Sequence, residues 1–207
     1  MNIDTLLLFA VLAFGFQSRK AWEQRKRITL LGRYLRNFQI EGLMETLTQG
    51  YLRAMGEADL ERRRGIWHIM AQHEHTLERQ LQQLVQEVGA ADAGDWRAST
   101  LPVHLPLSLQ LLPSASFDLR SLLRVHAQGV ASAIGNGLGL TERDRAFRLS
   151  AELLLLQHSC HWFCRSKTVA SARMLARHQT HYVQLLAAVA PATRTAYLRA
   201  LGTGQGS

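Results

Sequence analysis

The sequence predicts an all-α protein: a bundle of about five or six helices, with an N-terminal membrane-anchor helix and one extended, proline-containing insertion. Three observations carry this prediction. Apolar residues recur at helical spacing over long stretches, three of the four prolines fall in one segment, and 47% of the 207 residues are hydrophobic. That apolar content is enough for one core, and a chain of this length favours a single domain.

The N-terminal helix is predicted from an uninterrupted apolar run, Leu6–Phe16, of eleven residues. As a helix this run is about 16 Å long, and extending it to Met1 gives roughly 24 Å, against a hydrocarbon core of about 30 Å. We expect residues 1–18 to form a hydrophobic anchor, which attaches the protein to the membrane either as a single-pass span or peripherally. A cleaved signal peptide is disfavoured because Asp4 precedes the run and the positive charges follow it. A helix buried in the core is the remaining alternative.

The net charge of +8 is concentrated directly behind this run. Residues 19–36 contain seven basic residues against Glu23 alone, which gives +6. By the positive-inside rule, this block places the body of the protein on the cytoplasmic face of a bacterial-type inner membrane. Anionic membrane lipids are therefore the expected partner. The predicted membrane-interface residues are Arg19, Lys20, Trp22, Arg25, Lys26 and Arg27.

The helical domain is predicted to cover residues 19–201. Its first helix, 17–56, continues directly from the anchor, and Asp59 is expected to cap the next helix, 60–88. The second helix has a nearly heptad apolar stripe, which indicates coiled-coil-like packing or self-association through helices. The stripe consists of Leu60, Trp67, Met70, Leu77, Leu81, Leu84 and Val88.

The segment 89–116 is predicted to be extended, because Pro102, Pro106 and Pro113 exclude a helix. Between Leu101 and Leu111 apolar and other residues alternate, which is the period of a strand. The prolines exclude a central strand, so we expect an arm that covers the helices, or a short edge strand. A role in binding a protein partner is the functional alternative.

The C-terminal half is predicted to be helical again. One helix begins near Phe117 and ends at the glycines of 135–139, which suit a left-handed cap. Thr141 should cap a helical stretch over 142–190, which could be one helix or two. We favour a kink or break near 165–168, where Ser166 could cap a second segment, because compact domains rarely hold so long a helix. Pro191 begins a last short helix, and residues 202–207 are expected to be a disordered tail.

Several polar residues fall at predicted core positions and could hold a metal. Glu74 lies on the apolar stripe of 60–88 and needs a partner if buried; His126 lies on an inner face. Helical bundles can bind zinc, iron or haem through such side chains. The candidate ligands are His73, Glu74, His126, His158 and His161. The sequence contains neither Glu-x-x-His nor Cys-x-x-Cys-His, so a structural seam in which Glu74 hydrogen-bonds a histidine is favoured and no cofactor is predicted.

These features predict a non-enzymatic, membrane-anchored scaffold or assembly component. No catalytic constellation is complete, since there is no Gly-x-Ser-x-Gly and Cys160 and His161 are adjacent on a helix and point apart. A metal- or haem-binding bundle is the first alternative. A nucleic-acid-binding module that uses Arg19–Arg36 and Arg62–Arg64 is the second, and it is less favoured because no nucleic-acid-reading motif is present.

Overall fold

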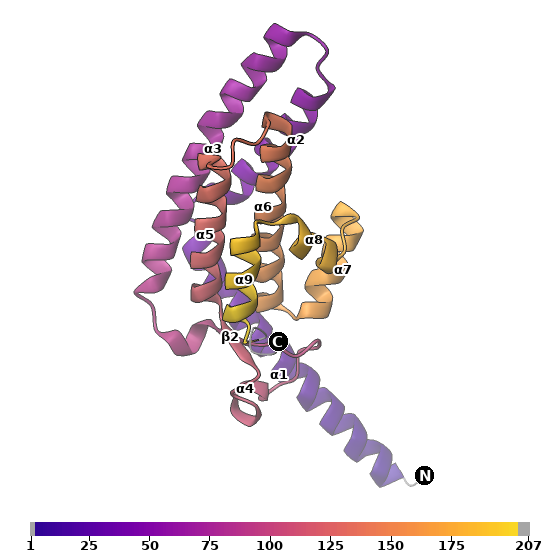
Figure 1. The fold of residues 1–207 in the computed structure, drawn as a ribbon. Coiled ribbons are helices and arrows are strands. Elements are labelled where there is room, and N and C mark those ends of the chain that lie inside the picture. The colour runs from indigo at the N-terminus through magenta and orange to yellow at the C-terminus, as the bar shows by residue number, and fades with distance from the viewer. Residues whose placement is uncertain (1–2, 203–207) are drawn as a thin grey trace.

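The computed structural model describes residues 3–202, and most of them lie in helices that pack along one another (Figure 1). The predicted all-α class is confirmed. The described part of the chain has nine α-helices, more and shorter than predicted: α1 (Ile3–Leu35), α2 (Ile40–Gly56), α3 (Leu60–Gly89), α4 (Ser108–Leu111), α5 (Leu119–Gly135), α6 (Glu142–Cys164), α7 (Lys167–His178), α8 (Tyr182–Ala188) and α9 (Pro191–Ala200). The tail predicted at the C-terminus lies outside the described residues beyond Gly202.

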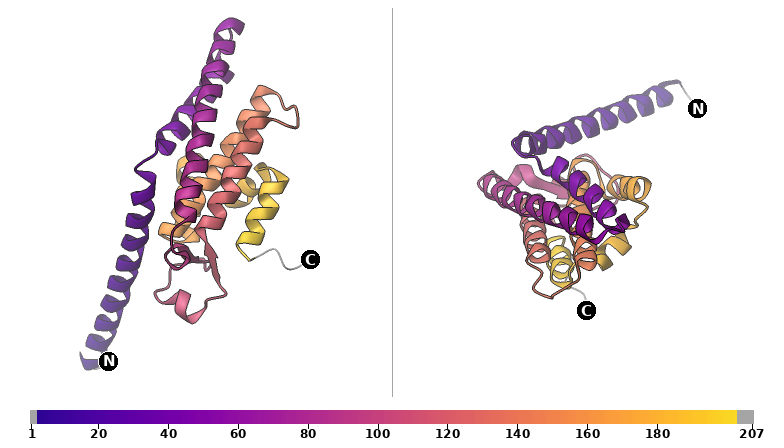
Figure 2. Two further views of the ribbon diagram at one scale, coloured as in Figure 1. Left: turned by 90° about the vertical axis from the view of Figure 1, so that its left-hand side faces the viewer. Right: turned by 90° about the horizontal axis from the view of Figure 1, so that it is seen from above.

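The predicted continuous helix over 17–56 is wrong, because the chain turns between α1 and α2. α1 ends at Leu35, and α2 begins at Ile40. No proline or glycine marks the turn, which is instead stabilised where the Gln39 backbone N–H donates to the side chain of Gln80 on α3, at 2.7 Å. The turn displaces α2 from the line of α1, so that α2 packs along α3 (Figure 2).

The α2–α3 hairpin follows the sequence prediction closely. The Asp59 carboxylate caps α3 by accepting from the Arg62 backbone N–H at 2.9 Å. The apolar stripe then faces the bundle, and Leu77 and Leu81 are almost completely buried. Only Leu60, at the start of the stripe, is exposed.

The sequence predicted the position of the extended segment correctly, but it did not predict where its strands lie. Its strands are β1 (Arg97–Ser99) and β2 (Ser116–Asp118), an antiparallel pair in which Ala98 lies opposite Phe117. The alternating stretch between Leu101 and Leu111 forms turns and the short α4 instead. Its prolines lack the N–H groups that a strand ladder needs, and its alternate leucines are largely exposed rather than facing a core.

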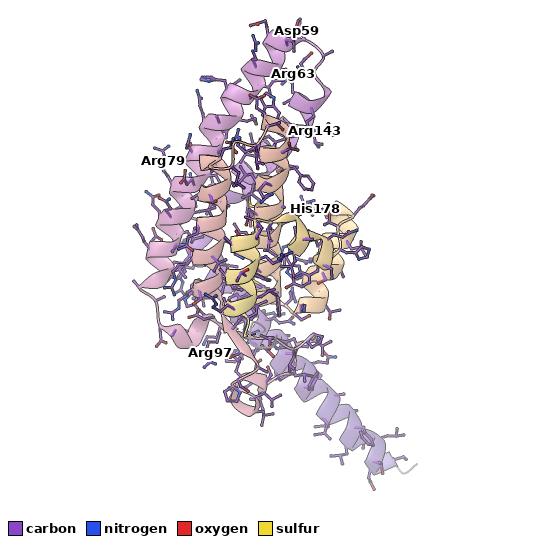
Figure 3. All side chains as sticks on the ribbon, in the orientation of Figure 1. Asp59, Arg63, Arg79, Arg97, Arg143 and His178 are labelled. Carbon is purple, nitrogen blue, oxygen red and sulfur yellow. The ribbon has the colours of Figure 1, made fainter. Side chains whose placement is uncertain are left out.

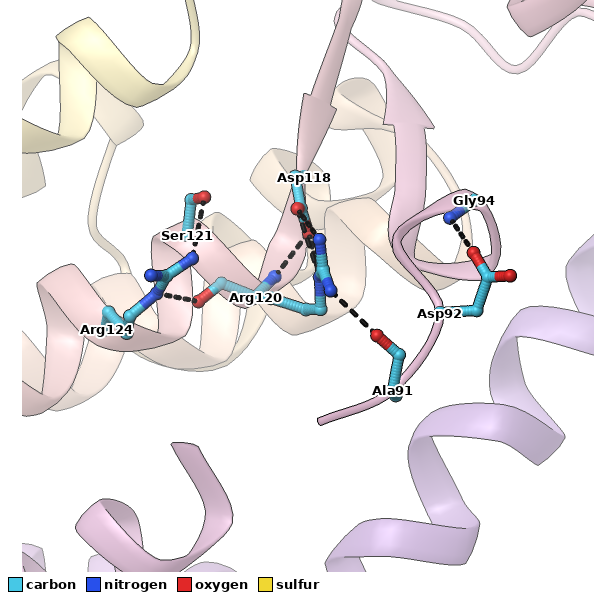
Figure 4. A network of polar contacts seen from close by, with 7 residues as sticks. All are labelled: Ala91, Asp92, Gly94, Asp118, Arg120, Ser121 and Arg124. Carbon is cyan, nitrogen blue, oxygen red and sulfur yellow. Dashed lines mark hydrogen bonds and ion pairs between the residues drawn. The ribbon is translucent and has the colours of Figure 1, made fainter. Parts of the chain in front are cut away.

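A polar network fixes the junction between the end of α3 and the start of α5 (Figure 4). The Arg120 guanidinium donates to both carboxylate oxygens of Asp118 and to the carbonyl oxygen of Ala91, the last at 2.8 Å. Asp118 also caps α5 by accepting from the Arg120 backbone N–H. A salt-bridged arginine on a backbone carbonyl thus anchors the hairpin to the bundle.

The C-terminal half is centred on α6, against which α5, α7 and α8 pack. The predicted break near 165–168 is confirmed, and Ser166 caps α7 by accepting from the Val169 N–H. The left-handed position after α5 is occupied by Asn136 (φ 47°) rather than by a glycine. Its side chain holds the turn through two hydrogen bonds with the backbone of Leu140.

Candidate functional site

The most unusual surface of the molecule is the N-terminal end of α1. Residues 3–16 project from the bundle as a free helical arm (Figures 1 and 2). Nine large apolar side chains on the arm are exposed, from 43% for Phe16 to 76% for Ile3: Ile3, Leu6, Leu7, Leu8, Phe9, Val11, Leu12, Phe14 and Phe16. The alternative of a helix buried in the core is therefore wrong. We call residues 3–16 the apolar arm.

The arm does not amount to a membrane span. Within residues 3–202, no helix combines the length and the apolar character needed to cross a bilayer. The predicted transmembrane anchor is thus not supported. The physical reason is that Asp4 and the charges from Arg19 onward bracket too short an apolar stretch in α1.

The first part of the predicted membrane-interface block forms a collar at the base of the arm. Arg19 pairs with Glu23 at 3.1 Å and lies over the indole of Trp22, 5.3 Å from the ring centroid. Trp22 is 58% exposed, Arg25 is exposed and Lys20 is half-buried. The collar (Arg19, Lys20, Trp22 and Arg25) thus combines an aromatic ring with cations, as at a membrane–water interface.

The remaining residues of that block, Lys26 and Arg27, contact the body of the protein. Lys26 pairs with Asp95 at 2.8 Å. Arg27 is buried, with its guanidinium over the Phe163 ring at 5.9 Å and Nη1 3.4 Å from Nδ1 of His104. Burial lowers the pKa of both groups, and the Arg27 cation lowers the pKa of His104 further.

A second set of contacts strengthens this junction. His104 Nε2 lies 3.2 Å from a carboxylate oxygen of Glu23, and Arg165 donates to the side-chain oxygen of Gln24 at 2.7 Å. α1 is therefore fixed to α6 and to the segment before α4 from Glu23 onward. Because the arm belongs to the same helix, this junction sets the direction in which the arm extends.

The five candidate metal ligands do not come together. Within residues 3–202, no group of three or more histidine, cysteine, aspartate or glutamate side chains could hold a metal ion. His126 and His158 are completely buried, but each contacts a serine: His126 Nε2 lies 2.9 Å from Ser159 Oγ, and His158 Nε2 lies 3.0 Å from Ser171 Oγ. Burial lowers their pKa to about 3 and about 4, so both are neutral at pH 7.

Glu74 is buried as predicted, but its partner is not a histidine. It accepts a hydrogen bond from the Tyr51 hydroxyl at 2.7 Å and forms an ion pair with Arg145. His73 lies on the same helix and is half-buried. His161 is half-buried on α6, beside a surface hollow between α6 and α7.

The sequence reasoning missed one buried acid, Glu152, which is completely inaccessible in α6. Its Oε1 accepts from the Ala190 backbone N–H at 2.9 Å, just before α9. Its position among Ala151 and the leucines of 153–156 was the available signal, because every neighbour in that run is apolar.

The two basic clusters of the nucleic-acid alternative belong to different helices: residues 19–36 lie on α1 and the turn after it, and residues 62–64 lie on α3. Arg63 lies at the far end of α3, opposite the N-terminal end of α1 (Figure 3).

Comparison with protein families, with curated proteins and with solved structures found no match to this chain. Its function is therefore argued from its own surfaces.

Proposed function

We propose that this protein is a membrane-associated helical scaffold that attaches by inserting the apolar arm into one leaflet of an anionic bilayer. The observation that carries the proposal is the exposure of nine large apolar side chains on a helix held clear of its own bundle. Exposed apolar patches of this kind mark interaction sites with lipid or protein.

The chemistry of the arm favours entry into the leaflet over lying flat on it. Apolar side chains surround the helix rather than forming one stripe, since Leu6, Leu7, Leu8 and Phe9 are all exposed. A helix of these 14 residues is about 21 Å long, whereas half of a core of about 30 Å is about 15 Å, so the arm would enter one leaflet at a tilt. Each such side chain gains about 1.5–3 kcal/mol when it leaves water.

The collar follows the arm in α1, so it would lie at the depth of the lipid headgroups when the arm is inserted. Trp22 suits the interface, and the cations beside it would contact anionic lipids. Under this proposal the body lies on the cytoplasmic face of a bacterial-type inner membrane, whose anionic lipids would attract the collar. The body would act there through protein partners or through self-association, without enzymatic activity of its own.

Charges placed on the arm should abolish attachment. We expect the Leu8→Glu, Val11→Glu double variant to lose flotation with phosphatidylglycerol-containing liposomes, by at least 100-fold in affinity, because two carboxylates oppose burial in hydrocarbon. The matched control is Leu138→Glu with Val183→Glu, since both are 76% exposed on the body and should leave flotation unchanged. The proposal would be contradicted if the wild-type protein stayed in the aqueous fraction. If it also formed oligomers that the arm variant does not form, the arm would be a self-association helix.

Neutralising two cations of the collar should remove their electrostatic contribution to membrane binding. We expect Lys20→Gln with Arg25→Gln to reduce affinity for anionic liposomes about 30-fold, since each cation near the surface contributes about 1 kcal/mol. The loss should shrink in high salt. Arg62→Gln with Arg143→Gln removes the same charge from exposed positions on the body and is the control. An equal loss in both variants would show that only net charge matters and would contradict a collar.

A further inference from the structure

A second surface, separate from the arm, has the composition of an anion site. A hollow of about 480 Å³ lies between α6 and α7. Its lining includes Gln157, His161, Arg173, Met174, Arg177 and His178. Two arginines and two histidines thus share one concavity, whose volume falls within the range of small-molecule sites.

Helical geometry aims these side chains at one space. Gln157 and His161 are four residues apart on α6, and Arg173 and Arg177 are four residues apart on α7, so each pair shares a helix face. Met174, 1% exposed, is the apolar lining residue from the buried face of α7. The hollow therefore has donors on two sides over an apolar base.

The two arginines in this hollow form no ion pair with the described residues. No ion pair or side-chain hydrogen bond holds Arg173, Arg177 or His161 there, and Nε2 of His178 is buried without a hydrogen-bond partner. Glu41, on α2, is the one acid whose charge acts on His161.

The histidines respond to this surplus of positive charge. Burial lowers the pKa of His161, and Arg173, Arg177 and His178 lower it further, while Glu41 acts in the opposite direction. Burial and Arg177 likewise lower the pKa of His178. An anion would offset this repulsion, because it stabilises the charged form of both imidazoles.

We infer that the hollow binds the phosphate group of a soluble phosphorylated small molecule, held by Arg173 and Arg177 with His161 and His178 beside them. Guanidinium groups match phosphate oxygens in charge and bidentate geometry. The volume leaves room for the rest of a small molecule around the phosphate. His178 lies on the side of the bundle, well away from the N-terminal end of α1, which favours a soluble ligand over a lipid headgroup (Figure 3).

The test is titration of the full chain with inorganic phosphate and with pyrophosphate, monitored by calorimetry and by histidine NMR, against chloride at equal ionic strength. We expect saturable binding and a rise in the pKa of His161 and His178. Arg173→Gln with Arg177→Gln should weaken binding at least tenfold, whereas Arg62→Gln with Arg143→Gln should not. Both pairs lie on exposed helix positions, so thermal unfolding should be unchanged and reports whether each variant folds.

Three results would overturn the inference: no difference between phosphate and chloride, equal weakening in both variants, or binding of the Leu8→Glu, Val11→Glu arm variant to phosphatidic acid vesicles that needs Arg173 and Arg177 and that inorganic phosphate does not compete. The arm variant is used for the vesicles because the wild-type arm is itself expected to bind anionic bilayers. The last result would assign the hollow to a lipid headgroup. Flotation of the Arg173→Gln, Arg177→Gln variant with phosphatidylglycerol liposomes keeps this site distinct from the arm, because it should equal that of the wild type.

Discussion

Replacing Arg145 with methionine will lower the free energy of unfolding by about 3–5 kcal/mol, because it leaves the buried Glu74 carboxylate without its cation. Glu74 is 1% exposed and Arg145 only 14%, so water cannot take over the lost contact. Tyr51 would remain as the one donor to Glu74, and one neutral hydroxyl does not compensate a buried charge. Chemical denaturation followed by far-UV circular dichroism measures the loss.

Two further variants separate the lost ion pair from the lost side chain. Arg143→Met removes an exposed arginine two residues earlier on α6 and should change stability by less than about 0.5 kcal/mol. Glu74→Gln combined with Arg145→Met removes the stranded charge and leaves an amide oxygen for the Tyr51 hydroxyl. That double variant should recover most of the loss; a double variant as unstable as Arg145→Met would mean that packing of the arginine stem, not charge, dominates.

The Glu74–Arg145 pair also shows which structural features can be predicted from the sequence. The stripe of α3 was sufficient to predict that Glu74 is buried, because helical periodicity is local. Its partner was not predictable, since Arg145 is 71 residues away and Tyr51 belongs to a different helix. The same limit applies to Arg27. In the sequence it is one of several cations in a basic block, and its contact with Phe163 depends on how α1 packs in the fold.

Capping signals were predicted well, because they depend on residues within one turn of the helix start. Asp59, Thr141 and Ser166 each cap the helix that the sequence assigned to them. The turn between α1 and α2 was missed because its stabilising contact reaches Gln80, on another helix. The alternation of apolar and other residues after Leu101 led to a wrong prediction of extended structure. A period of two predicts a strand only where a neighbouring strand can pair with it.

The direction of the apolar arm was the question that the sequence left open. The sequence favoured an anchor, but an apolar run of this length is also compatible with a core helix. Contacts from Glu23 onward decide between them, since they fix α1 to the body and leave the preceding residues without a packing partner of their own in the bundle. The candidate site is thus defined by tertiary contacts that no local pattern encodes.

The second large effect concerns pH and the buried acid Glu152. Burial raises the pKa of this carboxyl group above its ordinary value of 4.5, against the smaller opposing effects of the Ala190 N–H, Thr193 and Arg148. Its Oε2 has no hydrogen-bond partner, and space beside it is so limited that a Cβ on Gly129 would lie 2.5 Å away. The charged form is therefore poorly stabilised in the folded protein.

The sign of the pH effect follows from this shift. In the unfolded chain the carboxyl group loses its proton near pH 4.5, whereas in the folded protein it loses it at higher pH. Between these two values the folded state binds more protons, so stability falls as pH rises, by at most about 1.4 kcal/mol per pH unit. The fall ends at the folded-state pKa.

Glu152→Gln should remove this fall, because an amide keeps the acceptor for the Ala190 N–H and cannot ionise. We expect the variant and the wild type to be equally stable near pH 4, and the variant to be increasingly more stable toward pH 7. The buried histidines His126 and His158 act in the opposite direction in acid, but they are present in both proteins and cancel in the difference. Thermal unfolding from pH 4 to pH 8 provides the measurement, with Glu87→Gln as the exposed control. A difference independent of pH would mean that the pKa of Glu152 is the same in the folded and the unfolded protein, and would contradict the prediction.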